Sequence, residues 1–116
     1  MIRAYKMLTF QAAALVGAGL MMATVSEMTK AAPPAAAVEI GNFTFKTPTL
    51  TVKPGTTVTW TNGDEDPHTV SATGGPFHSK TLTDGATFRY TFAKPGRYAY
   101  LCTIHPFMRG TVVVTG

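Results

Sequence analysis

The feature that most constrains the fold is a succession of short runs of β-branched and aromatic residues, separated by turn residues. Two similar turns, Lys53-Pro54-Gly55 and Lys94-Pro95-Gly96, each precede such a run, and no stretch has a convincing 3.6-residue apolar period. We predict strands over Val38–Phe45, Thr49–Lys53, Thr56–Thr61, His68–Ala72, Ala86–Phe92, Gly96–Cys102 and Gly110–Thr115. The expected fold is all-β, a small Greek-key β-sandwich or barrel of about seven to eight strands.

The N-terminal segment has the pattern of an export signal. Arg3 and Lys6 precede an uncharged, mostly apolar run that reaches Met22, and small residues follow it. This pattern is typical of a secretory signal peptide, so we predict one over 1–31, cleaved between 26 and 32, and a periplasmic location. The alternative is a retained anchor, because the apolar run approaches the lower length of a bilayer span. Unless the segment is retained, no membrane span is expected.

The rest of the chain is predicted to form a single domain. Residues 32–37 contain only alanine and proline, and we interpret them as a linker. Residues 38–116 are enough for one small core and not for two. The single cysteine excludes a disulfide framework. A bound metal is then the usual additional source of stability for so small a domain.

Charge and composition exclude two classes of protein. From residue 38 onward, seven Lys/Arg and five Asp/Glu give a net charge of +2, and there is no basic run. A nucleic-acid-binding domain would show a basic stripe, so we expect no nucleic-acid partner. At 45% hydrophobic and 14% charged residues, the chain has the composition of a folded protein and not of a disordered one.

Four residues of this domain could ligate a metal. Cys102 is followed by His105 three residues later and by Met108 after three more, and His68 precedes Cys102 by 34 residues. A two-strand hairpin between His68 and Cys102 would return the chain to the same end of the sandwich. One loop would then present three ligands, and a neighbouring strand start would present the fourth.

Each of these residues has an ordinary interpretation when taken alone, since a lone cysteine is usually a small buried hydrophobe. Together they indicate a metal site, because a free thiol in an oxidising compartment is a liability unless something holds it. Two histidines, a cysteine and a weak axial methionine form the type 1 (blue) copper arrangement. Zinc would accept the cysteine and both histidines but usually takes a different fourth ligand, and one cysteine cannot hold an iron–sulfur cluster.

These motifs resemble those of the cupredoxins, specifically the plastocyanin/amicyanin group, over essentially all of 38–116. The resemblance lies in Thr47–Asn62, in Pro67-His68 and in Cys102-Thr-Ile-His105-Pro-Phe-Met108-Arg-Gly110, whose short gap between histidine and methionine is that of the amicyanins. It implies a cupredoxin fold with one copper ion. The two histidines and Cys102 would be the equatorial ligands and Met108 the axial one.

Three positions depart from the family pattern. The residue after the first histidine ligand is often asparagine, which braces the ligand loop, and here it is Thr69. The residue before the second histidine ligand is often proline, and here it is Ile104, which keeps an N–H that proline would lack. Both differences bear on the tuning of the reduction potential, because outer-sphere contacts affect it. His78 stands where relatives often have an acidic residue, and we expect it to be a surface loop residue.

The resemblance also implies a function, that of a one-electron carrier cycling between Cu(I) and Cu(II). Its partners would be transient redox proteins, such as an amine dehydrogenase as donor and a c-type cytochrome as acceptor, and we expect a monomer. The alternative is a copper delivery or storage protein, although these favour exposed Met/His clusters and the domain has a single methionine. An enzyme is not expected, because a second copper centre needs several more histidines and only His78 is spare.

Overall fold

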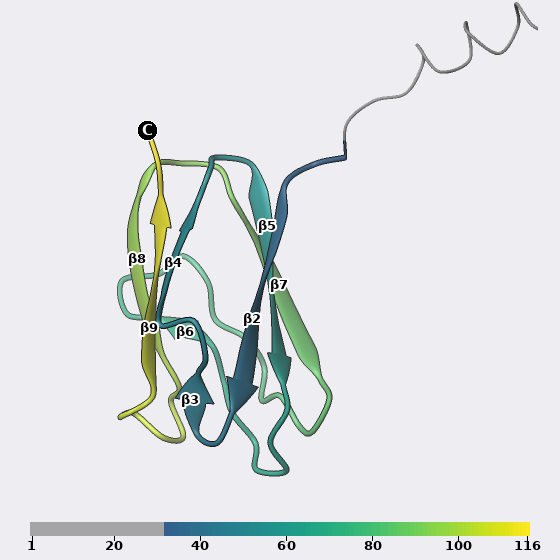
Figure 1. Ribbon diagram of the computed structural model, residues 1–116. Helices are drawn as coiled ribbons and strands as arrows, with labels where there is room; N and C mark the ends of the chain where they lie inside the picture. Colours follow the sequence, from purple (N-terminus) through teal and green to yellow (C-terminus); the bar gives the residue numbers. More distant parts are fainter. Residues whose placement is uncertain (1–31) are drawn as a thin grey trace, which may run out of the picture. The chain divides into compact units, whose positions relative to one another are not determined.

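The computed structural model describes residues 32–116, which form eight strands and no helix (Figure 1). The strands are β2 (Ala35–Gly41), β3 (Thr44–Phe45), β4 (Thr49–Val52), β5 (Thr56–Asn62), β6 (Ser71–Ala72), β7 (Thr87–Phe92), β8 (Gly96–Leu101) and β9 (Arg109–Val114). The predicted all-β fold is confirmed. The predicted signal peptide lies outside the described residues, and within them no helix could cross a membrane.

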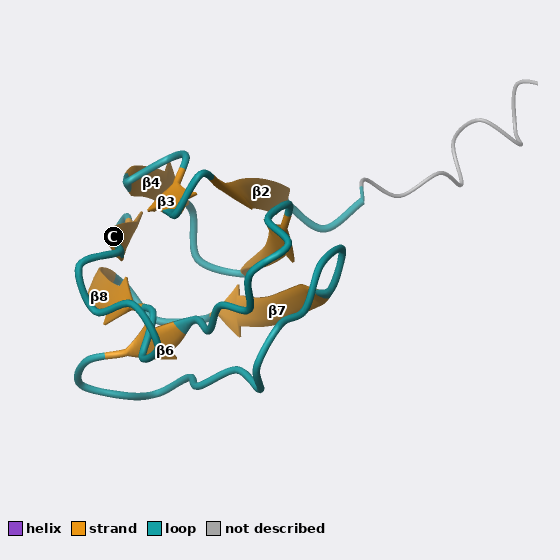
Figure 2. Cartoon of the chain, turned by 90° about the horizontal axis from the view of Figure 1, so that it is seen from below, coloured by secondary structure: helices purple, strands orange, loops and turns teal. Residues whose placement is uncertain are grey.

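The strands form two four-stranded sheets, seen from below in Figure 2. One sheet has the order β3-β2-β5-β7 and the other the order β4-β9-β8-β6. Each sheet contains one parallel pair, β2 with β5 or β4 with β9, and its other pairs are antiparallel. Because β3 and β4 belong to different sheets, as do β5 and β6, the chain crosses repeatedly between the two layers.

The core lies between the sheets, and burial alternates along the strands. Val58 and Trp60 of β5 are buried, as are Val112 and Val114 of β9, with intervening side chains more exposed. Burial of one such side chain stabilises the fold by roughly 1.5–3 kcal/mol. Two predicted metal ligands, a cysteine and a methionine, belong to the same buried cluster, so the packing of the core also holds the candidate site.

The domain begins earlier than the sequence suggested. Ala35–Ala37, which we interpreted as part of a linker, form the first half of β2 and pair in parallel with Thr57–Thr59 of β5. This end of β2 is largely exposed, so alanine is large enough there. Backbone pairing and not side-chain burial holds the segment, and the composition therefore gave no sign of it.

The predicted strand Val38–Phe45 is in fact two strands joined by a two-residue turn. Gly41 pairs with Thr44, and the intervening Asn42 and Phe43 have φ angles of 54° and 57°. Positive φ at both central residues is what a type I′ hairpin turn requires, and this conformation is unfavourable for phenylalanine. The sequence has no glycine at this turn to reveal it.

The predicted strand His68–Ala72 is reduced to Ser71–Ala72. His68 makes an isolated bridge with Leu82, and the next two backbone N–H groups leave the ladder. The N–H of Thr69 donates to the sulfur of Cys102, and that of Val70 donates to Ser79 Oγ. The strand pattern is interrupted because the backbone there is used to build the candidate site.

Candidate metal centre

Three of the four predicted ligands lie together at one end of the sandwich. The Nδ1 atoms of His68 and His105 are 3.2 Å apart, and each lies 3.8 Å from Cys102 Sγ. All three potential ligand atoms lie within 4.8 Å of one another. His68 and Cys102 are fully buried and His105 is half-buried, so the group has a covered side and an exposed side.

The β8–β9 loop presents Cys102 and His105 in a compact form. Cys102 directly follows β8, and its N–H donates to the carbonyl of Met108 at 3.1 Å. The N–H of Met108 in turn donates to the carbonyl of His105 at 2.9 Å. The three residues spaced at i, i+3 and i+6 therefore lie in one loop that is closed by hydrogen bonds between their own backbone groups.

His68 comes from the connection between β5 and β6. Its N–H donates to the Leu82 carbonyl at 3.1 Å, and the Leu82 N–H donates back to the His68 carbonyl at 2.7 Å. This pair of bonds anchors His68 independently of the β8–β9 loop. The structure thus brings His68 and Cys102 together across 34 residues of sequence, as predicted.

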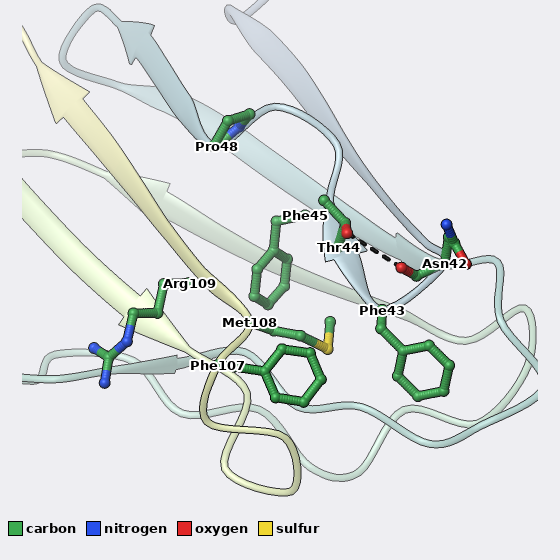
Figure 3. A pocket seen from close by; sticks show the side chains of 8 residues that line it. All are labelled: Asn42, Phe43, Thr44, Phe45, Pro48, Phe107, Met108 and Arg109. Atoms are coloured by element: carbon green, nitrogen blue, oxygen red, sulfur yellow. Dashed lines mark hydrogen bonds between the residues drawn. The ribbon is translucent and has the colours of Figure 1, made fainter.

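Met108 is buried, with 2% of its surface exposed, at the edge of the core. It lines an open cavity of about 320 Å³ together with Phe43 and Phe107, and Figure 3 shows its thioether between these two rings. Its backbone joins it to the other predicted ligands, as described above. A thioether in this position can serve as a weak, soft ligand.

The surroundings of Cys102 favour the thiolate. Burial by itself raises the pKa of this thiol, but hydrogen bonds from the backbone N–H groups of Thr69 and His105 and from the imidazoles of both histidines together lower its pKa from 9.0 to about 6. The Thr69 nitrogen is 3.3 Å from the sulfur. Because the thiolate is the form that binds metals, the site is prepared for a metal ion near neutral pH.

Thr69 also links the two ligand segments through its side chain. Its Oγ1 accepts the backbone N–H of Thr103 at 2.7 Å and lies 2.8 Å from the hydroxyl oxygen of Thr103. Thr69 therefore braces the loop that carries Cys102 and His105.

Asp64 is a contact of the site that sequence reasoning missed. Its Oδ2 lies 2.9 Å from Nε2 of His68, and its two oxygens accept the N–H groups of Asn42 and Phe43 at 2.7 and 2.9 Å. The bond from Phe43 contributes most to holding the pKa of Asp64 below its ordinary value, against the opposing effect of burial. Its only signal in the sequence is an acidic residue four positions before His68, which by itself indicates no more than a negative charge in the loop.

Aromatic and aliphatic side chains surround the two imidazoles. The ring of Phe43 meets His68 edge-on at 5.5 Å between centroids and meets His105 in the same way at 5.1 Å. On the exposed side, Ile104 and Phe107 have 44% and 70% of their surfaces accessible. His105 therefore lies within an apolar rim.

The donor set fits copper. Two imidazole nitrogens and a thiolate, with a thioether beside them, have the softness that copper prefers, whereas zinc sites rarely include a thioether. His78 is outside this group. It is exposed, and its Nδ1 lies 2.5 Å from Ser71 Oγ.

Comparison with known proteins agrees with this geometry. Residues 33–115 match the family model described as copper binding proteins of the plastocyanin/azurin family. The chain is 39% identical over 111 residues to amicyanin-alpha of Methylorubrum extorquens, covering 90% of this chain and 89% of the relative. It is 41% identical over 88 residues to amicyanin of Paracoccus versutus, covering 70% of this chain and 67% of the relative.

Solved structures give the same result for the fold. The oxidised state of an amicyanin mutant superimposes with a TM-score of 0.66 at 40% identity, over 69% of this chain and 81% of that chain. A Cu(I) structure of another amicyanin mutant gives the same TM-score at 39% identity and the same coverage. The predicted cupredoxin-like sandwich is confirmed.

Proposed function

The chain belongs to the plastocyanin/azurin family of copper-binding proteins, and we propose that it is a periplasmic type 1 copper protein that carries single electrons between redox partners. Its cofactor is one copper ion. The proposed ligands are His68, Cys102 and His105 in the equatorial plane and Met108 in the axial position. We propose that the protein is an electron carrier and not an enzyme.

The observation that carries this proposal is the convergence of a thiolate and two imidazoles from two independently anchored segments. Copper supplies the one-electron couple. The chain holds the ligand atoms together through hydrogen bonds and core packing that do not depend on the metal. Little then has to move when the oxidation state changes, which favours rapid electron transfer.

The apolar rim around His105 supports transient docking. Ile104 and Phe107 expose apolar surface beside the half-buried imidazole, and such a patch suits a small, short-lived interface. An electron would leave through His105, which is the exposed ligand. The likeness to amicyanins favours an amine dehydrogenase as donor and a c-type cytochrome as acceptor, and the carrier is proposed to act as a monomer.

A periplasmic location accords with two features of the chain. The first 31 residues have the pattern of a cleavable export signal. The one cysteine is placed where a metal would hold its thiol, as a chain in an oxidising compartment requires. Fractionation of the producing cells, with the size of the mature chain measured by mass spectrometry, tests both the location and the cleavage.

The test of the function is repeated redox cycling of the copper-loaded protein. Stopped-flow reduction and reoxidation with small redox reagents should bleach and restore the visible band without loss of copper. A Cu(I) chelator added during the reduced phase distinguishes the alternative. A carrier retains its copper, whereas quantitative transfer to the chelator within seconds would favour delivery or storage and contradict the proposal.

A further inference from the structure

We propose that Asp64 is a positioning residue of the copper centre, whose carboxylate fixes the orientation and tautomer of the His68 ligand and ties it to the β2–β3 turn. This inference rests on the proposed function, because it assigns His68 as a ligand. It goes beyond that function by naming a side chain that touches no metal and yet governs how a ligand is presented.

The two ring nitrogens of His68 face different partners. Nε2 lies 2.9 Å from Asp64 Oδ2, whereas Nδ1 faces Cys102 Sγ at 3.8 Å and His105 Nδ1 at 3.2 Å. A neutral imidazole has one N–H donor and one lone pair, and an ionised carboxylate can only accept. Asp64 therefore selects the tautomer with the proton on Nε2. The lone pair of Nδ1 is left pointing at the other ligand atoms.

The carboxylate is itself held in place. The Asp64 N–H donates to Asn62 Oδ1 at 2.9 Å, and Nδ2 of the fully buried Asn62 donates to the carbonyls of Asp66 and Leu82, each at 2.9 Å. The Leu82 carbonyl also accepts the His68 N–H. Asp64 and its histidine are therefore attached to the same framework, so their hydrogen bond is not a chance surface contact.

The remaining lone pairs of the carboxylate organise the turn. The N–H groups of Asn42 and Phe43 both donate to Asp64, and these are the two non-glycine residues with positive φ among residues 32–116. The hydrogen bonds offset the cost of placing a phenylalanine in the left-handed region. The ring of Phe43 then packs edge-on against both imidazoles. One carboxylate thus fixes the orientation of the His68 ligand and the position of the Phe43 ring beside it.

This arrangement has an electronic consequence. A carboxylate that accepts the N–H of a ligating imidazole makes the imidazole a better donor, and its negative charge favours the more highly charged metal. Both effects stabilise Cu(II) relative to Cu(I) and lower the reduction potential. Loss of such a partner typically weakens metal binding about 10- to 100-fold. If the affinity for Cu(II) falls and that for Cu(I) does not, each tenfold loss of Cu(II) affinity raises the reduction potential by about 59 mV.

The test compares Asp64→Asn with Glu65→Gln in the copper-loaded protein. Glu65 is the exposed neighbour in the same loop, so its substitution makes the same change in charge without the contact to the ligand. We expect the Asp64→Asn protein to stay blue with a potential raised by about 59 mV or more. The Glu65→Gln protein should shift by a small fraction of that. Asp64→Glu keeps the carboxylate and should return the potential toward the wild-type value.

A second readout uses the metal-free protein. Imidazole ¹⁵N shifts of wild-type His68 should show the proton on Nε2, and the Asp64→Asn variant should show a mixture of tautomers. Equal shifts in potential for Asp64→Asn and Glu65→Gln, or an unchanged tautomer in Asp64→Asn, would overturn the proposal. If Asp64→Asn does not fold, a wild-type tautomer with the proton on Nδ1 overturns it instead. A wild-type protein that forms no blue centre contradicts the proposed function, whereas the tautomer still reports on Asp64.

Discussion

Replacement of Thr69 by valine tests whether this residue braces the copper loop. Thr69→Val keeps the size of the side chain and the backbone N–H that donates to Cys102, and it removes only the hydroxyl group. That hydroxyl accepts the N–H of Thr103 at 2.7 Å and lies 2.8 Å from the hydroxyl oxygen of the same residue. The substitution therefore breaks two hydrogen bonds between the two ligand segments.

The size of the effect follows from those two bonds. Each lost hydrogen bond costs roughly 0.5–1.5 kcal/mol. Only 6% of the surface of Thr69 is exposed, so water is a poor replacement for the lost acceptor. We expect the free energy of unfolding to fall by about 2 kcal/mol. For a domain of this size, that corresponds to a decrease in Tm of roughly 8–16 °C.

Thr103→Val provides the matched control. It removes the hydroxyl–hydroxyl bond but leaves the Thr103 N–H donating to Thr69 Oγ1, so the loss should be about 1 kcal/mol. Thermal and urea unfolding of the metal-free proteins, followed by circular dichroism, measure both values without a contribution from copper binding. If Thr69→Val is no less stable than Thr103→Val, the inferred brace does not stabilise the domain.

Two further predictions concern the ligands themselves. Met108→Gln should keep a blue centre and lower the reduction potential measured by voltammetry, because an amide oxygen is a harder donor that favours Cu(II); loss of copper with the fold intact would contradict an axial role. The lowered pKa of Cys102, about 6 in the folded metal-free protein, means that the folded state binds fewer protons than the unfolded state between pH 6 and 9. The free energy of unfolding should therefore rise with pH across that window and fall again on acidification, more steeply in the wild type than in Cys102→Ala, as urea unfolding at pH 6 and 9 would show. Identical pH dependence in the two proteins would refute the shifted thiol.

The parts of the fold that could be predicted are those in which side-chain burial follows a local pattern. The alternation in β7 and β9 was visible in the sequence because Phe92 and Val112 point into the core and their neighbours are more exposed. The start of β2 and the Asn42–Phe43 turn were not visible. Backbone pairing holds the first, and a carboxylate from a distant loop stabilises the second.

The candidate site divides in the same way. The β8–β9 loop carries three of its proposed ligands within seven residues, so their spacing could be read directly from the chain. The contacts of Asp64 with Asn42 and Phe43, and that of Thr69 with Thr103, could not, because each joins segments more than twenty residues apart. Such contacts depend on how the two sheets bring loops together, which no local pattern encodes.

The most direct test of the central claim is the visible absorption spectrum of the copper-loaded protein, compared with that of Cys102→Ser. A Cu(II)–thiolate bond gives intense charge-transfer absorption, so the oxidised wild type should be deep blue. The serine variant should lose the colour even where the histidines still retain some copper. A wild type that binds copper and remains colourless, or a blue Cys102→Ser variant, would contradict the assignment of a type 1 centre at Cys102.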